Sequence, residues 1–107
     1  MVPEKSRVAD VGTDHGYIPI ALVERGIAVR AIAMDLRPGP LERAEEHIRR
    51  AGLWGSVETR LSDGLSKLSP GEVDAAVIAG MGGELIIHIL ENGRHVWQDM
   101  GRFILSP

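Results

Sequence analysis

The chain has 107 residues and 44% hydrophobic content, which indicates one globular domain at most and excludes disorder over the whole chain. Its formal net charge of -3 argues against an autonomous nucleic-acid binder, and the absence of cysteine excludes disulfides, thiolate metal sites and cysteine nucleophiles. Because the sequence shows neither a signal-peptide pattern nor a long apolar segment, we expect a cytoplasmic protein that does not enter a membrane.

The predicted elements alternate between strands and helices. In chain order they are a strand over 7–11, a helix over 17–25, a strand over 29–34, a helix over 39–51, a strand over 56–61, a helical turn over 65–68, a buried strand over 73–79, a helix over 84–92 and a strand over 102–105. Pro19 suits the first turn of its helix, and Gly26 and Gly52 suit the positions just after helix ends. The alternation predicts an α/β fold with a parallel sheet and helices on both faces.

Ligands of such sheets bind at the carboxyl ends of the strands. Four segments of the sequence fall there, namely 10–16, Asp35, Asp63-Gly64 and 80–83. Their common location favours a ligand site more strongly than any one segment does.

The first of these loops joins glycines to acids. Gly12 and Gly16 allow a close approach of the backbone to a ligand, although the same pair also suits a plain strand-to-helix turn. A nicotinamide-dinucleotide fingerprint needs a glycine where this chain has Asp14, and that carboxylate would face a pyrophosphate. S-adenosylmethionine has no phosphate and carries a sulfonium and an ammonium, so Asp10 and Asp14 would attract it. The residues therefore favour the methyl donor over the dinucleotide.

The next two segments suit a nucleoside. Asp35 follows Asp10 at about the spacing of a ribose-binding acid. Asp63 could accept a bond from an adenine amino group while a backbone N–H near Gly64 donates to the ring. Both also have plain structural interpretations, as a solvated acid at a strand end and as a turn.

The motifs together resemble those of the bacterial tRNA (adenine(22)-N(1))-methyltransferase family. The resemblance extends over nearly the whole chain in order and spacing, and its segments are Asp-Val-Gly-Thr-Asp-His-Gly-Tyr-Ile-Pro at 10–19, Ala-Ile-Ala-Met-Asp at 31–35, Asp-Gly-Leu at 63–65, Ile-Ala-Gly-Met-Gly-Gly at 78–83 and Phe-Ile-Leu-Ser-Pro at 103–107. It implies a Rossmann-like class I methyltransferase fold with S-adenosyl-L-methionine as the cofactor.

The resemblance also implies roles for residues. The neighbours of Gly12 would line the methionine moiety, Asp35 the ribose and Asp63-Gly64 the adenine. The residues assigned to cofactor binding are Asp10, Gly12, Gly16, Asp35, Asp63, Gly64, Gly80, Met81 and Gly82. The loop over 80–83 stands where many amino-methyltransferases place Asn-Pro-Pro-Tyr against the target base, and those side chains are absent.

The implied reaction is methyl transfer to N1 of an adenosine in tRNA. This nitrogen has a lone pair, so the site has to unpair the base, align it and accept bonds from its amine. Asp14 is the leading candidate for that electrostatic role, with His15 and Tyr17 positioning or stacking the base. Asp14 serves equally well as a helix-start acid, and for His15 and Tyr17 a structural role is favoured.

The family resemblance also predicts missing parts. Family members begin with a further helix and continue past the fifth strand, so residues 1–107 are expected to be a single, partial cofactor-binding domain. Binding of tRNA would need the C-terminal part, and the open edge over 103–105 predicts self-association. Two alternatives remain, a non-catalytic remnant that at most binds the cofactor and an NAD(P)-binding oxidoreductase.

The remaining conspicuous side chains suggest less. His47 and His88 fall in helical patterns and His95 in a loop, without the spacing of metal ligands, so no metal site is predicted. Trp54 and Trp97 are interpreted as hydrophobic cover near helix ends, although an exposed tryptophan could stack on a base. The arginines, among them Arg37, Arg43, Arg49, Arg50 and Arg60, are interpreted mainly as solvated charges, three of them paired with Glu42, Glu45 and Glu46.

Overall fold

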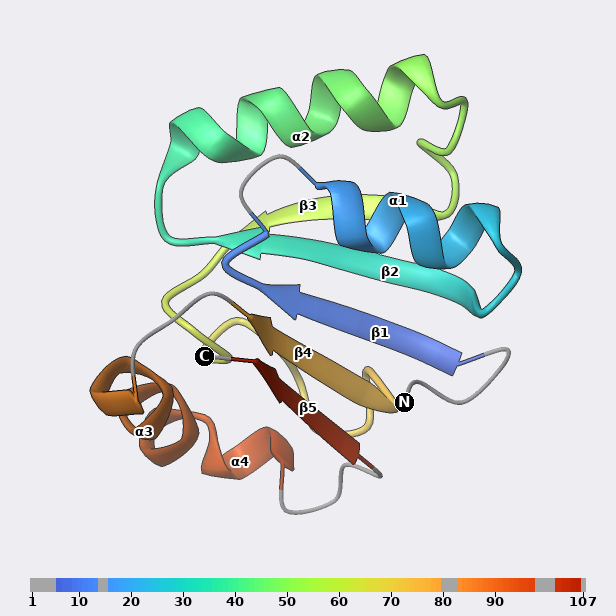
Figure 1. The fold of residues 1–107 in the computed structure, drawn as a ribbon. Helices are drawn as coiled ribbons and strands as arrows, with labels where there is room; N and C mark the ends of the chain where they lie inside the picture. Colours follow the sequence, from blue (N-terminus) through green and yellow to red (C-terminus); the bar gives the residue numbers. More distant parts are fainter. Residues whose placement is uncertain (1–5, 14–15, 80–82, 98–101, 107) are drawn as a thin grey trace.

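The structure, a computed structural model, describes residues 6–13, 16–79, 83–97 and 102–106. Its five strands form one parallel sheet in the order β3-β2-β1-β4-β5 (Figure 1). The strands are β1 Ser6–Val11, β2 Ala28–Asp35, β3 Val57–Leu61, β4 Ala75–Ala79 and β5 Arg102–Ser106. The helices are α1 Tyr17–Glu24, α2 Pro38–Arg50, α3 Gly83–Asn92 and α4 Arg94–Trp97. The predicted α/β architecture is confirmed.

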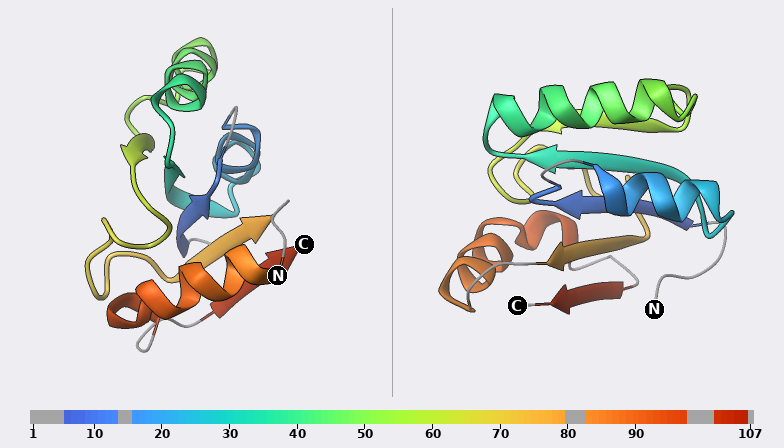
Figure 2. Two further views of the ribbon diagram at one scale, coloured as in Figure 1. Left: turned by 90° about the vertical axis from the view of Figure 1, so that its left-hand side faces the viewer. Right: turned by 45° about the horizontal axis from the view of Figure 1, so that its top comes forward.

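The two faces of the sheet have separate cores, and Figure 2 gives two further views of the helices that contribute to them. On one face, Ile20 of α1 and Ile48 of α2 pack with alternate residues of β2 and β3. On the other face, Ile86 and Ile89 of α3 and Val96 of α4 pack with the opposite set of strand residues. Because side chains alternate along a strand, each apolar strand covers both cores at once. Helices on both faces were predicted and are found.

The central strands owe their position to this double burial. Ala9 of β1 and Ala75, Ala76 and Ile78 of β4 are each 0% exposed, and the two strands pair in register from Val8↔Ala75 to Val11↔Ile78. Small and branched apolar residues are what a strand buried on both faces requires. β5 pairs with β4 and is the edge of the sheet as far as the structure describes it. Self-association through this edge stays a prediction.

Three details differ from the sequence predictions. The strand predicted over 73–79 begins at Ala75 instead, because the Asp74 N–H leaves the strand pattern to donate to the Arg7 carbonyl. His95 lies in the short helix α4 rather than in a loop, since the turn after Gly93 buries Val96 against α3. Trp54 is 77% exposed and therefore is not hydrophobic cover; its neighbour Leu53 packs on that core instead.

The surface arginines form more varied pairs than predicted. Arg50 pairs with Glu46 along α2 as expected. Glu45, however, accepts a hydrogen bond from the Thr59 hydroxyl of β3 at 2.7 Å, and Arg60 of β3, expected to be a solvated charge, pairs with Glu58 and Glu72. Contacts between elements therefore take acids that the sequence suggested were paired within one helix.

Candidate functional site

The carboxyl ends of β1, β2 and β3 are joined by backbone hydrogen bonds. Just beyond β1, the Thr13 N–H donates to the Met34 carbonyl of β2 at 2.7 Å. Just beyond β3, the Ser62 N–H donates to the Asp35 carbonyl at 2.9 Å. These bonds extend the backbone pairing one or two residues beyond the strands and hold the three strand ends side by side. The predicted gathering of 10–13, Asp35 and Asp63-Gly64 at this edge is thus seen in the structure.

The loop after β1 depends on left-handed glycines. Gly12 has φ 74° and Gly16, which caps α1, has φ 78°. The Gly16 N–H donates to the Thr13 carbonyl at 3.1 Å. A Cβ added at Gly16 would lie 3.0 Å from the Ala44 Cβ of α2, so both the conformation and the close approach of the two segments favour glycine. Asp14 and His15 lie outside the described residues.

Asp10 is a buried acid whose carboxyl group has an unused hydrogen-bonding position. It is 2% exposed, and its Oδ2 has no hydrogen-bond partner among the described residues, nor does the Thr13 hydroxyl. Burial is the main cause that raises the pKa of Asp10 to about 7; the nearby Thr13 hydroxyl lowers it, and the Asp35 carboxylate raises it further. Buried polar groups in proteins almost always have partners. An unpartnered carboxylate therefore points to a group that is bound here in the functional state.

Asp35 ends the neighbouring strand and is 5% exposed. Its Oδ1 accepts a hydrogen bond from the Arg37 N–H at 3.0 Å and lies 3.5 Å from the Arg37 guanidinium Nε. In the strand alternation Asp10 and Asp35 belong to the set that faces α1 and α2, with Val8, Ala31 and Ala33. The two acids thus lie on the same side of the sheet.

The segment after β3 is held by Ser62, which the sequence analysis missed. Ser62 is 4% exposed, its hydroxyl donates to the Gly64 carbonyl at 2.8 Å, and its Oγ accepts from the Lys67 N–H at 3.2 Å. Gly64 has φ 59° and packs on Ile89 of α3, while Asp63 is exposed. A serine next to Asp-Gly at a strand end is a turn signal that could have identified this role.

Tyr17, the first residue of α1, directly follows the loop after β1. It is 64% exposed, and its ring stacks on His47 of α2 with centroids 5.0 Å apart and planes 14° apart. The sequence analysis treated His47 as an ordinary helix residue, and no spacing rule could have linked two residues so far apart. Gly80, Met81 and Gly82, which follow β4, lie outside the described residues.

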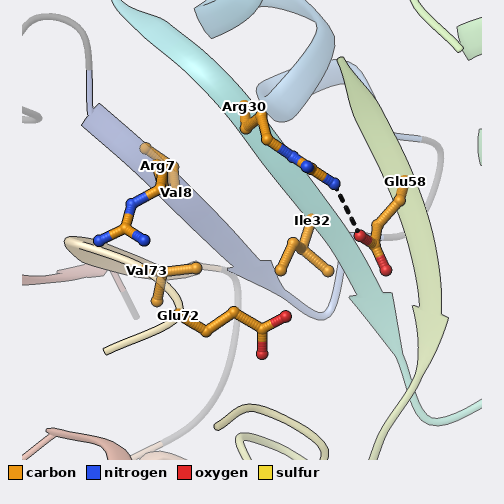
Figure 3. A pocket seen from close by; sticks show the side chains of 7 residues that line it. All are labelled: Arg7, Val8, Arg30, Ile32, Glu58, Glu72 and Val73. Carbon is orange, nitrogen blue, oxygen red and sulfur yellow. Dashed lines mark hydrogen bonds and ion pairs between the residues drawn. The ribbon is translucent and has the colours of Figure 1, made fainter. Parts of the chain in front are cut away.

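A cavity of about 220 Å³ lies elsewhere, toward the amino ends of the strands (Figure 3). It is lined by Arg7, Val8, Arg30, Ile32, Glu58, Glu72 and Val73. Its charged side chains all have partners: Arg30 pairs with Glu58 at 3.2 Å, Arg7 pairs with Asp74 at 3.0 Å, and Glu72 accepts two bonds from Arg60. We regard it as a structural ion-pair network and not as the ligand site.

Among the described residues, no group of three or more potential metal-ligating side chains occurs. Within the same part of the chain, no helix is long and apolar enough to cross a membrane. The described part of the strand ends offers carboxylates, the Thr13 and Ser62 hydroxyls, backbone groups and the exposed Tyr17 ring.

Comparison with known proteins decides the family. The whole chain, residues 1–107, matches the family model described as a methyltransferase domain. The chain belongs to this family. A tRNA (adenine(22)-N(1))-methyltransferase of Bacillus subtilis is 41% identical to this methyltransferase domain over 106 residues, which are 99% of the chain and 44% of the relative. The domain thus spans less than half the length of this relative.

Solved structures agree with this assignment. A Streptococcus pneumoniae protein, solved in complex with S-adenosyl-L-methionine, is 40% identical with a TM-score of 0.93, over 98% of this methyltransferase domain and 50% of that chain. TrmK of M. capricolum, in complex with the natural cofactor product S-adenosyl-homocysteine, is 32% identical with a TM-score of 0.86, over 98% of the domain and 46% of that chain. The predicted family resemblance and the Rossmann-like methyltransferase fold are confirmed.

Proposed function

We propose that residues 1–107 form a single S-adenosyl-L-methionine-binding domain, and that its activity is methyl transfer to N1 of an adenosine in tRNA. The observation that carries the proposal is the buried Asp10 carboxylate, whose Oδ2 has no partner among the described residues and which lies beside Asp35 at the strand ends. The relatives named above add the cofactor and the substrate class. A tRNA substrate places the enzyme in the cytoplasm.

The residue types at the strand ends fit S-adenosyl-L-methionine. Asp35, joined by Asp10 once a bound cation has ionised it, gives this end of the sheet a negative potential, which favours a ligand with cationic groups and disfavours a pyrophosphate. The left-handed Gly12 and Gly16 keep the loop after β1 free of side chains that would block an approaching ligand. The same features argue against the dinucleotide alternative, as does the family.

The predicted binding residues are proposed to divide the cofactor among them. Asp10, Gly12 and Gly16 would hold the amino-acid part, Asp35 would accept bonds from ribose hydroxyls, and Asp63 with Gly64 would meet the adenine. Asp35 suits its role because Arg37 already orients its Oδ1. Gly80, Met81 and Gly82, outside the described residues, are proposed to complete the same pocket. When bound, S-adenosyl-L-methionine supplies a methyl group activated by a sulfonium.

The chain's own residues have to present the target base. N1 of adenine carries a lone pair, so no residue has to remove a proton from it before the transfer. The proposed work is to hold the unpaired base in line and to accept hydrogen bonds from its amine. Asp14 is proposed to accept these bonds, and His15 and Tyr17 to position the base. The exposed ring of Tyr17 is available for stacking on one side of its contact with His47.

The first experiment tests cofactor binding. Calorimetry with S-adenosylhomocysteine should show saturable binding, and Asp35→Ala should weaken it about tenfold or more, because bonds between hydroxyls and a buried carboxylate are lost. Glu42→Gln, which removes one exposed negative charge from α2, is the matched control and should bind like the parent chain. Binding of a nicotinamide dinucleotide without binding of S-adenosylhomocysteine would refute the proposal.

The second experiment tests methyl transfer. The chain is incubated with unmodified tRNA and a methyl donor labelled in its methyl group, and modified positions are mapped by reverse transcription, which stops where N1 of adenine is methylated. Label in the RNA that is lost in Asp14→Ala and retained in Glu42→Gln would support the assigned reaction. Cofactor binding without transfer would restrict the function of this chain to binding the cofactor.

A further inference from the structure

Asp10 is a buried acid whose Oδ2 has no partner among the described residues. Of the two buried acids at the strand ends, Asp35 is compensated by the backbone and the guanidinium of Arg37. Among the described residues, no cation pairs with Asp10, and none donates a hydrogen bond to its Oδ2. Ionising an isolated buried carboxyl is costly, so such a group keeps its proton until a counter-charge arrives.

The surroundings of Asp10 come from three directions. Across β1 and β2 the charged group is Asp35, which repels a second negative charge. Across β1 and β4 the register partner is the apolar Val77. The Thr13 hydroxyl approaches from the loop that leads to α1; it lowers the pKa of Asp10, but by less than burial raises it. The other titratable groups of this loop, Asp14 and His15, lie outside the described residues, and the test below separates their effect.

We propose that Asp10 is protonated in the free chain and gives up its proton when a cationic group of the ligand is placed against it. The inference rests on the proposed function, because it takes the methyl donor as the ligand. In the exchange, the O–H bond of Asp10 breaks, the proton leaves to solvent, and the carboxylate forms an ion pair with the ligand's ammonium. The ammonium is the better candidate than the sulfonium, because Asp10 is 2% exposed and the sulfonium methyl has to remain open to a substrate.

The acidity of the group supports this exchange. Burial raises the pKa of Asp10 to about 7, so below neutral pH most free molecules carry the proton. A cation against Oδ2 lowers that pKa, and binding therefore releases a proton in this range. The affinity for a cationic ligand should rise up to about tenfold per pH unit below about pH 7 and level off above about pH 8.

The test is calorimetry of the chain with S-adenosylhomocysteine, which retains the ammonium. Titrations at about pH 6 in two buffers of different ionisation enthalpy give the number of protons released, and we expect most of one proton. A neutral ligand, 5′-methylthioadenosine, should bind without proton release. Binding of S-adenosylhomocysteine with no proton release and with an affinity that does not change between about pH 6 and 8 would overturn the inference and leave the proposed function intact. Absence of binding by either ligand at every pH would overturn the proposed function itself.

Two variants identify the titrating group. Asp10→Asn should remove the proton release, whereas His15→Gln should retain it; the opposite result would assign the proton to His15 and overturn the inference. If Asp10→Asn binds too weakly for calorimetry, carboxyl carbon NMR of the free chain decides the matter. The signal that is absent from Asp10→Asn should then titrate near neutral pH in the parent chain, and titration in the ordinary range of aspartate would overturn the inference.

Discussion

Replacing Asp10 by asparagine should stabilise the free chain at neutral and alkaline pH. The carboxyl is 2% exposed, and its pKa of about 7 compares with 3.8 for an ordinary aspartate. Between these two values the unfolded chain loses the proton while the folded chain keeps it, so the free energy of unfolding falls as pH rises. The total loss is at most about 4 kcal/mol, reached above about pH 7.

Asparagine has nearly the same shape and no charge, so this loss disappears in Asp10→Asn. The assay is urea unfolding of both chains at about pH 5 and pH 8, and the parent chain should lose about 3 kcal/mol more than the variant between them. Glu42→Gln, an exposed acid on α2, should follow the parent. A variant that is less stable than the parent chain at about pH 8, or that shows the same pH dependence, would refute the reasoning.

Two further predictions concern stability away from Asp10. Gly16→Ala places a Cβ 3.0 Å from the Ala44 Cβ at φ 78°, whereas the Cβ of Gly26→Ala, at φ 72°, meets nothing within 4 Å. Both variants should have a lower thermal midpoint than the parent chain, and Gly16→Ala should lose about 1 kcal/mol more stability than Gly26→Ala. Equal losses of stability in the two variants would show that the contact of the added Cβ with Ala44 has no energetic cost. Arg60 lowers the pKa of Glu72 to about 2, so this carboxylate stabilises the fold above its ordinary pKa and loses that effect as pH falls toward about 2. Glu72→Gln should therefore cost about 1 to 2 kcal/mol in urea unfolding at neutral pH and much less in acid; an equal cost at both pH values would contradict this.

The sheet and its order of elements were predictable because burial on two faces leaves a clear pattern in a short strand. β4 is almost wholly apolar and α2 repeats apolar residues at steps of three and four. The ends of the elements were less predictable. Where Asp74 bonds to β1 and where Val96 packs on α3 depend on partners far away in the sequence.

The candidate site, too, was predictable only in part. The sequence placed acids and glycines at the strand ends, because these residue types have a chemical meaning at that position. It could not show that the Asp10 Oδ2 has no partner among the described residues while Asp35 has Arg37, because hydrogen bonding of buried groups is set by the packed structure. The exposure of Trp54 was also missed, since adjacent apolar residues compete for one place on the core and local pattern does not reveal which one fills it.

The stacked pair of Tyr17 and His47 has a practical consequence. Tyr17 is the only tyrosine in the chain, and its ring lies against His47 at the start of α1. A fluorine label introduced through tyrosine would thus give a single resonance, located next to the loop after β1. Its chemical shift would report changes in the stacking of the two rings, and occupation of the neighbouring loop, without any engineered residue.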